Sequence, residues 1–279
     1  MQTIIFGLAS AVFWGACDFS GGLVSRRIGA ARATFAIQAL GLPFVLVIAW
    51  LTGQMQMSLD DWLWCGAAGV IGSLGFLALY RSLADGQMST AAPVAALTSA
   101  SFPVLVGVFR DGLPSGRMLA GFGLALAAIW FVSQTGADQP AAGFRWKSLG
   151  LPFLAGTGLG AYFVLINQGS QTSIFAPLVA VRTSGALTLL VFAVQRSELP
   201  LPARPIWPLM ALNTALDVGG SLFYILAGQS GRMDLAALLA SLYSGVTVCL
   251  AWLISHEKIT RKQWLGILMT LVAIILITK

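Results

Sequence analysis

The chain alternates between long apolar runs and short polar breaks from one end to the other. Each run is bounded by polar residues, Gly or Pro, and most are about as long as the roughly 20 residues that a helix needs to cross a bilayer. A lone segment in hydrocarbon must satisfy its own backbone groups, so each run is predicted to be a helix. The ten predicted spans are 3–24, 33–52, 62–83, 88–109, 117–134, 148–168, 174–195, 206–229, 233–254 and 263–278.

The order of runs and breaks in the first part of the chain recurs in the second part. A shift of 146 residues lays Asp111 on Glu257 and Thr98 on Ser244. An internal repeat of this length dictates the fold. We therefore expect a first five-helix unit at 1–134, a connecting loop at 135–147 and a second five-helix unit at 148–279.

An odd number of spans in each unit decides how the two units are related. Two homologous units of five spans must enter the membrane from opposite sides. The predicted fold is an all-α integral membrane protein of ten transmembrane helices, arranged as two inverted five-helix repeats. Transporters use this design and bind their solute near the midplane, between the repeats.

Composition agrees with a membrane protein, because 57% of the residues are apolar and only 9% are charged. Soluble domains carry about 25% charged residues. The net charge of +6 comes from Lys and Arg in the polar breaks, where such residues set topology, so we expect no nucleic-acid partner. The three cysteines lie inside apolar runs and are interpreted as small buried side chains.

The distribution of Lys and Arg predicts the orientation. Eleven lie in the breaks after the odd-numbered spans and four lie on the other side. The positive-inside rule then places both termini outside. The first set is Arg26, Arg27, Arg32, Arg81, Arg145, Lys147, Arg196, Arg204, Lys258, Arg261 and Lys262, and the second is Arg110, Arg117, Arg232 and Lys279.

No enzyme signature is found. The single histidine, His256, lies in a polar break, and the chain has no His-Glu-x-x-His, Walker loop or Gly-x-Ser-x-Gly motif. We expect no catalytic residues, no metal, no cofactor and no nucleotide. The expected partners are a small-molecule solute and the lipid bilayer, and the sequence leaves the oligomeric state open, with a monomer sufficient.

The paired polar breaks resemble the EamA family of the drug/metabolite transporter superfamily. They begin at Arg110 and His256, and each precedes a helix with Gly and Ala. Further similarities are Phe13-Trp14-Gly15, Pro103, and Pro177 with Arg182, although Asp111 stands where Glu is usual and Cys249 stands where the fourth span has Pro103. The resemblance implies a ten-helix exporter of amino acids, other small metabolites or drugs. It also implies both termini inside, against the charge count.

Few ionisable residues lie inside predicted spans, where a charge at the bilayer centre costs about 2.5–3.5 kcal/mol. Those well inside a span are Asp18, Arg182 and Asp217. Asp217 lies near the middle of its span, and Asp18 lies about two-thirds along the first span. Either Asp could couple protons or hold a cation. Alternatively, one or both pair with Arg182, which the family motif places at a helix contact. Tyr224, seven residues after Asp217, could donate a hydrogen bond to its carboxylate.

Polar and aromatic residues within the spans could line a cavity for an amphipathic solute of amino-acid size. Each hydroxyl could instead bond a carbonyl of its own helix or a neighbouring helix. The candidates, with the two Asp residues, are Trp14, Asp18, Ser73, Tyr80, Thr98, Ser99, Phe102, Tyr162, Asn167, Asp217, Ser221, Tyr224, Ser241, Tyr243 and Ser244. Pro93, Pro103, Gly156 and Gly160 could act as gates or only as packing positions.

The sequence therefore predicts a secondary transporter in a bacterial cytoplasmic membrane. The first hypothesis is an exporter of amino acids or similar metabolites that works by alternating access. The second keeps the fold and changes the cargo to lipophilic cations. The third is a membrane enzyme or structural subunit that transports nothing.

Overall fold

The computed structural model describes residues 1–84, 88–133, 150–195, 206–256 and 259–278. In these ranges the regular structure is helical throughout, apart from turns, and no strand occurs. The predicted loop at 135–147 lies outside them, as do the side chains of Tyr80 and Pro93. The helices are α1 (Gln2–Ile28), α2 (Ala30–Leu51), α3 (Leu59–Ala84), α4 (Met88–Asp111), α5 (Gly116–Ser133), α6 (Gly150–Gly169), α7 (Phe175–Gln195), α8 (Trp207–Gln229), α9 (Met233–Ala240), α10 (Tyr243–Ser255) and α11 (Arg261–Thr278).

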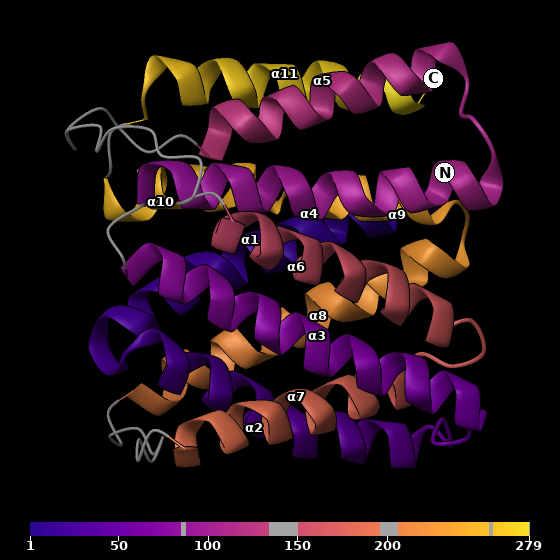
Figure 1. The fold of residues 1–279 in the computed structure, drawn as a ribbon, viewed down its shortest axis with the longest axis vertical. Helices are drawn as coiled ribbons and strands as arrows, with labels where there is room; N and C mark the ends of the chain where they lie inside the picture. The colour runs from indigo at the N-terminus through magenta and orange to yellow at the C-terminus, as the bar shows by residue number, and fades with distance from the viewer. Residues whose placement is uncertain (85–87, 134–149, 196–205, 257–258, 279) are drawn as a thin grey trace.

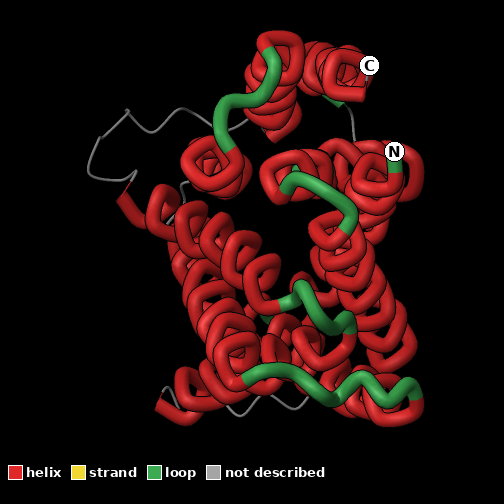
Figure 2. The backbone as a smooth tube through the Cα atoms, turned by 90° about the vertical axis from the view of Figure 1, so that its right-hand side faces the viewer, coloured by secondary structure: helices red, strands yellow, loops and turns green. Residues whose placement is uncertain are grey.

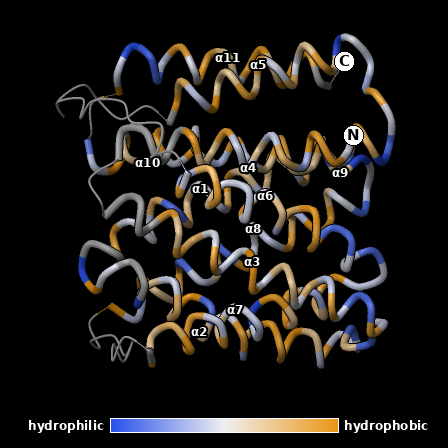
Figure 3. Tube along the Cα trace, viewed as in Figure 1, coloured by the Kyte–Doolittle hydropathy of each residue, from blue (hydrophilic) through white to orange (hydrophobic). Residues whose placement is uncertain are grey.

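The helices have the length and composition of membrane spans. Within the described residues, eight segments are long and apolar enough to cross a bilayer, and the apolar segment Gly116–Val132 is shorter. Hydrophobic positions run along the helices, and hydrophilic positions concentrate at their ends and connections (Figure 3). The chain is thus an all-helical, multi-pass membrane protein, whereas the count of ten crossings remains a prediction.

The span predicted at 233–254 matches the candidate membrane span Met233–Ser255, but two helices cover it where one was expected. The helix α9 ends at Ala240, and α10 begins at Tyr243. At the break, the N–H of Leu242 donates to the oxygen of Leu239 at 3.2 Å, a tighter turn than the α-helical one. The Ser241 hydroxyl also donates to the oxygen of Ala237 at 2.8 Å, a back-bond that bends helices. Apolar patterning carries no sign of this break.

The most extensive helix contacts join the two parts of the chain. The helices α1 and α8 pack together, as do α3 and α6, α2 and α7, and α5 and α11. In each pair one helix comes from residues 1–134 and the other from the second part of the chain. The α5/α11 pair forms one edge of the bundle (Figure 1), and in the perpendicular view it projects beyond the remaining helices (Figure 2).

Glycines permit close crossings in two of the most extensive helix pairs. Where α8 meets α1, a methyl group on Gly220 would lie 2.6 Å from the indole nitrogen of Trp14. Where α3 meets α6, a methyl group on Gly158 would lie 3.2 Å from the Cα of Gly75, so two backbones approach each other directly. Small residues allow this approach between membrane helices.

The helix ends carry the capping signals that their sequences contain. After α2, Gly53 adopts a left-handed φ of 66°, and the N–H of Gln54 donates to the oxygen of Ala49 at 2.9 Å. Before α11, the N–H of Gln263 donates to the Thr260 hydroxyl, and the N–H of Thr260 donates to the Gln263 side chain. Such caps fix where the chain turns back and which residues meet at the ends of the bundle.

Candidate functional site

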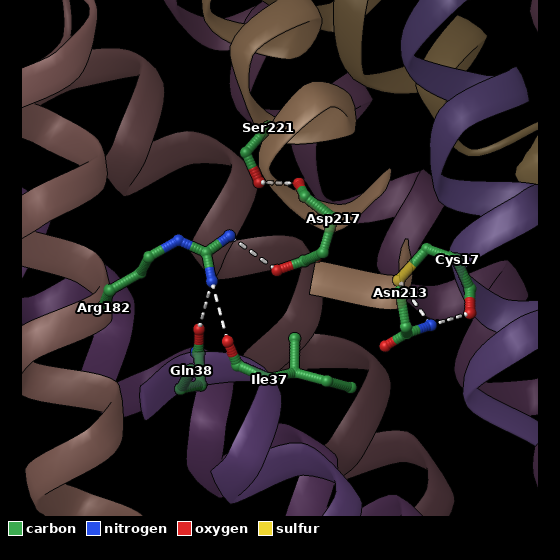
Figure 4. A network of polar contacts seen from close by, with 7 residues as sticks. All are labelled: Cys17, Ile37, Gln38, Arg182, Asn213, Asp217 and Ser221. Carbon is green, nitrogen blue, oxygen red and sulfur yellow. Dashed lines mark hydrogen bonds and ion pairs between the residues drawn. The ribbon is translucent and has the colours of Figure 1, made fainter. Parts of the chain in front are cut away.

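A buried ion pair lies half-way along the helices. Arg182 of α7 donates from its Nη2 to Oδ2 of Asp217 on α8 at 2.7 Å (Figure 4). The Arg182 side chain is 3% exposed and that of Asp217 is 26% exposed. Since Asp217 is the eleventh of the 23 residues of α8, the pair lies near the middle of the bundle. The alternative in which Asp217 pairs with Arg182 is thus the arrangement observed.

The other side of the guanidinium reaches across to the first part of the chain. Nη1 of Arg182 donates to Oε1 of Gln38 at 3.2 Å and to the backbone oxygen of Ile37 at 3.4 Å, both on α2 (Figure 4). Gly41, one turn further along α2, leaves the space, because a methyl group there would clash with the guanidinium. Nε of Arg182 is buried and has no hydrogen-bond partner among the described residues. Arg182 therefore links α7, α8 and α2.

Asp18 differs from Asp217, because its side chain is exposed although it lies well inside α1. It follows Trp14 by four residues and so shares the side of α1 that packs against Phe163 and Tyr224. By contrast, the exposed Val12 lies about 120° from Asp18 around α1, at 100° per residue, so the two residues are exposed on different sides of the helix. The carboxylates of Asp18 and Asp217 are close enough for their charges to interact. Asp18 is therefore exposed toward the interior of the bundle, and no ion-pair partner is found for it among the described residues.

Asn213 connects α8 to α1 one turn from the ion pair. Its Nδ2 donates to the backbone oxygen of Cys17 (Figure 4). The same Nδ2 donates to the Ser20 hydroxyl at 2.7 Å. Its Oδ1 is fully buried without a partner in the described part of the chain. We call Asp18, Gln38, Arg182, Asn213, Asp217 and Ser221 the central polar cluster.

Sequence reasoning missed Gln38 and Asn213. Both are amides inside apolar runs, and Asn213 precedes Asp217 by four residues, on the same helix face. That spacing was an available signal. For Gln38 only its polarity within an apolar run was available, because its partner Arg182 lies 144 residues away.

An aromatic group forms one wall beside the cluster. The ring centroids of Trp14 and Phe163 are 5.5 Å apart, and those of Phe163 and Tyr224 are 5.0 Å apart. The Tyr224 hydroxyl donates to the backbone oxygen of Phe163 at 2.8 Å. The expected hydrogen bond from Tyr224 to Asp217 is therefore wrong, because burial of the hydroxyl requires a partner and the nearest is on α6.

Four of the predicted cavity hydroxyls donate to backbone carbonyls three or four residues earlier in the chain. Ser221, for example, donates to the backbone oxygen of Asp217 at 2.9 Å. Each hydroxyl that donates to a carbonyl retains lone pairs that can accept a bond from a solute. The hydroxyls of Thr98, Ser99 and Ser241 likewise donate to carbonyls three or four residues earlier.

Several other candidates lie at helix contacts. Thr98 and Phe102 of α4 lie against Gly156 and Gly160 of α6, where added methyl groups would clash, so both glycines sit at a close crossing. Pro103 is buried within α4. The hydroxyl of Ser73 is buried without a partner in the described residues, as is Nδ2 of Asn167. Tyr243 and Ser244 are half-buried at the start of α10, directly after the break.

No metal site is evident, because the described residues contain no group of three His, Cys, Asp or Glu side chains that could hold an ion. Formally, the central polar cluster contains two carboxylates and one guanidinium. Asp217 is neutralised by Arg182, and Asp18 is the remaining acidic group. The arrangement can bind a cation or a proton at Asp18 and offers hydrogen bonds from neighbouring amides and hydroxyls.

Comparison with protein families decides the class. The sequence model of the EamA-like transporter family matches this chain twice, over residues 1–134 and 146–279. The chain belongs to the EamA-like transporter family. The predicted resemblance is therefore confirmed over the whole chain, and this EamA-like chain is a membrane transporter by family.

Two further similarities agree with the family. The "Putative sugar uptake protein" of Streptococcus pyogenes serotype M6 (strain ATCC BAA-946 / MGAS10394) is 23% identical to this EamA-like chain, over 99% of the chain and 98% of that protein. A solved crystal structure superposes with a TM-score of 0.76 at 13% identity, covering 99% of this chain and 96% of the other. At that identity the structural likeness establishes the fold alone.

Proposed function

We propose that this chain is a secondary transporter that carries small polar metabolites, such as amino acids, across a bacterial cytoplasmic membrane by alternating access. The observation that carries the proposal is the central polar cluster. Charged side chains within membrane helices are costly and mark solute or ion pathways. Here they lie half-way through the bundle, where helices from both parts of the chain meet.

The packing supports two inverted repeats. Suppose that α1, α2, α3, α4 and α5 correspond in order to α6, α7, α8, α9/α10 and α11. Exchanging each helix for its counterpart then turns the contact of α1 with α8 into the contact of α6 with α3. The contact of α4 with α6 likewise becomes that of α9 and α10 with α1, and both contacts are present. The α2/α7 and α5/α11 pairs map onto themselves, as pairs on a two-fold axis do. The double match of the family model favours the same duplication.

The two acidic residues take different roles in this proposal. Asp217 is a positioning group, because Arg182 holds its carboxylate in an ion pair at 2.7 Å. Asp18 has no such partner and is exposed toward the interior. Asp18 therefore binds the ammonium group of a solute or exchanges a proton with it. The solute's remaining polar groups bond to the amides and hydroxyls around it, and the Trp14 ring covers its apolar part.

A second cargo class has an observation in its favour. The sugar uptake protein named above aligns over nearly its whole length. A sugar would use the amides and hydroxyls of the cluster without needing the charge of Asp18. The same transporter can export or take up its solute, because the direction of a secondary transporter follows the gradient of the solute or of the coupled ion.

Counterflow in proteoliposomes tests the proposal. Liposomes that contain the purified chain and an unlabelled solute are given labelled amino acids, hexoses or lipophilic cations in turn. We expect saturable exchange of one polar class. Asp18→Asn should abolish the exchange of an amine-bearing solute, whereas Asp60→Asn, which removes an exposed carboxylate at the start of α3, should leave it unchanged. Absence of exchange for every class would overturn the proposal in favour of a structural subunit.

A further inference from the structure

The end of the bundle that carries the N-terminus is held together by hydrogen bonds between the two parts of the chain. The connections α2–α3, α4–α5, α6–α7 and α8–α9 meet there and face the viewer in Figure 2. Nη1 of Arg110 donates to Oε1 of Gln168 at 2.6 Å, joining α4 to α6. The N–H of Ile174 donates to Oε1 of Gln54 at 3.2 Å, joining the α6–α7 and α2–α3 connections. A solute that crosses this end must part some of these contacts.

Arg232 at the same end is held by two hydrogen bonds to a buried carboxylate. Its Nε and Nη2 donate to the two carboxylate oxygens of Asp234 at 3.1 and 2.8 Å. Asp234 is 0% exposed, whereas the Arg232 side chain is 29% exposed. Paired N–H donors fix the guanidinium plane on a carboxylate. The carboxylate thus holds the guanidinium head in place at the start of α9.

The fixed guanidinium reaches the other part of the chain. Its Nη2 donates to the oxygen of Gly112 at 3.1 Å, and its Nη1 donates to the oxygen of Asp111 at 3.5 Å. These acceptors belong to the turn between α4 and α5, where Gly112 has a left-handed φ of 81°. The two helices are close here, because a methyl group on Gly107 of α4 would lie 2.6 Å from Cβ of Asp234.

The bonds of Arg232 to Asp234 and its bonds to the oxygens of Asp111 and Gly112 differ in the free energy that their loss would cost. Breaking the ion pair would strand the buried Asp234, whereas releasing the two carbonyl oxygens exposes them to water at the surface. The carbonyl contacts can therefore form and break while the ion pair persists. The hydrogen bonds to Asp234 raise the pKa of Arg232 above its ordinary value, so the side chain stays charged throughout the physiological range.

We propose that Arg232 is the latch of a gate at this end, closing it by holding the carbonyl groups of Asp111 and Gly112. The inference rests on the proposed alternating access. The helix α9 is the moving element: it has eight residues, begins at the latch and ends at the break before Tyr243. Release of the two carbonyls lets the start of α9 move away from the α4–α5 turn without distorting α10.

The test measures the distance across the latch. Spin labels are attached to Leu113→Cys and Ser230→Cys, two exposed positions in the facing turns, in a Cys249→Ser background that removes the exposed native thiol. Two ordinary hydrogen bonds contribute about 1–3 kcal/mol, so Arg232→Gln should raise the ratio of long to short distances by roughly tenfold or more. Arg117→Gln is the matched control, because it removes an exposed charge at the same end and should leave the distances unchanged.

A second variant guards against misfolding. Arg232→Lys keeps a positive charge beside Asp234 but loses the forked donors that reach the two carbonyls, so it should give a smaller shift in the same direction. Distances in Arg232→Gln and Arg232→Lys that both match the wild type would overturn the latch. Counterflow on the same liposomes keeps the two proposals separate. If the wild type exchanges solute and the distances in both variants match those of the wild type, only the latch is refuted. A wild type that exchanges nothing refutes the transport function itself.

Discussion

Replacing Asp217 by Asn tests whether the ion pair is structural. The variant keeps the size of the side chain and one acceptor oxygen but removes the negative charge. Arg182, 3% exposed, would then retain only Gln38 and the oxygen of Ile37 as acceptors. A guanidinium left in that position without a counter-charge is the main cost of the change.

The size of the cost follows from the burial of each partner. Removing one partner of a fully buried pair costs about 3–5 kcal/mol. Asp217 is 26% exposed, so water compensates in part, and the Asn oxygen can still accept a bond from Nη2. We therefore expect a loss of about 2–3 kcal/mol in the free energy of unfolding, below the range for a fully buried pair. That loss corresponds to a fall of roughly 30- to 150-fold in the folding equilibrium.

Denaturant unfolding in mixed micelles measures the change in the free energy of unfolding. The measurement forms a double-mutant cycle of Asp217→Asn, Arg182→Met and the variant that carries both substitutions. The double variant should recover much of the stability lost by Asp217→Asn, because it leaves no unpaired charge. The coupling between the two sites should be about 1–3 kcal/mol. If Asp217→Asn is as stable as the wild type, and its transport loses its dependence on a pH gradient, Asp217 carries the proton and the structural role is refuted.

Three other predictions concern neighbouring features. Asp18→Asn should express and unfold like the wild type yet lose exchange of an amine-bearing solute and, for any other solute, lose stimulation by a pH gradient; poor folding with normal exchange and coupling would contradict its role in binding. Tyr224→Phe should lower the unfolding free energy by about 1–3 kcal/mol, because it leaves the buried oxygen of Phe163 without its donor, and counterflow should retain its pH dependence. A reporter active only in the cytoplasm, fused after Lys279, should be silent if the charge count sets the topology; strong activity would place both termini inside.

Much of the helical layout could be predicted because it depends on local properties. The apolar runs set the helix positions, and Gly53 and Thr260 mark boundaries through their own backbone and side-chain bonds. The break after Ala240 could not be predicted in this way. It occurs inside an apolar run, where the hydrophobic pattern is the same for one helix or two.

The site was predictable in its components more than in its contacts. Asp18, Arg182 and Asp217 are conspicuous because charges are rare in apolar runs. Which carboxylate takes the arginine depends on how α7 and α8 pack, and that depends on contacts between distant residues. The partner of the Tyr224 hydroxyl was misjudged for the same reason, since helical spacing places a residue on a face but does not identify the neighbouring helix.

The interleaved packing of the helices has a consequence for biogenesis. Because α1 packs on α8, α3 on α6 and α5 on α11, the helices of the first half find their main neighbours only after the second half has been inserted. Until then, the nascent first half holds membrane-embedded helices with their glycine faces uncovered and with Gln38 lacking Arg182. We therefore expect neither half to fold on its own, and we expect a chain truncated after the fifth helix to be degraded. We expect the two halves, made as separate polypeptides, to assemble when both are present, because the most extensive helix contacts lie between them.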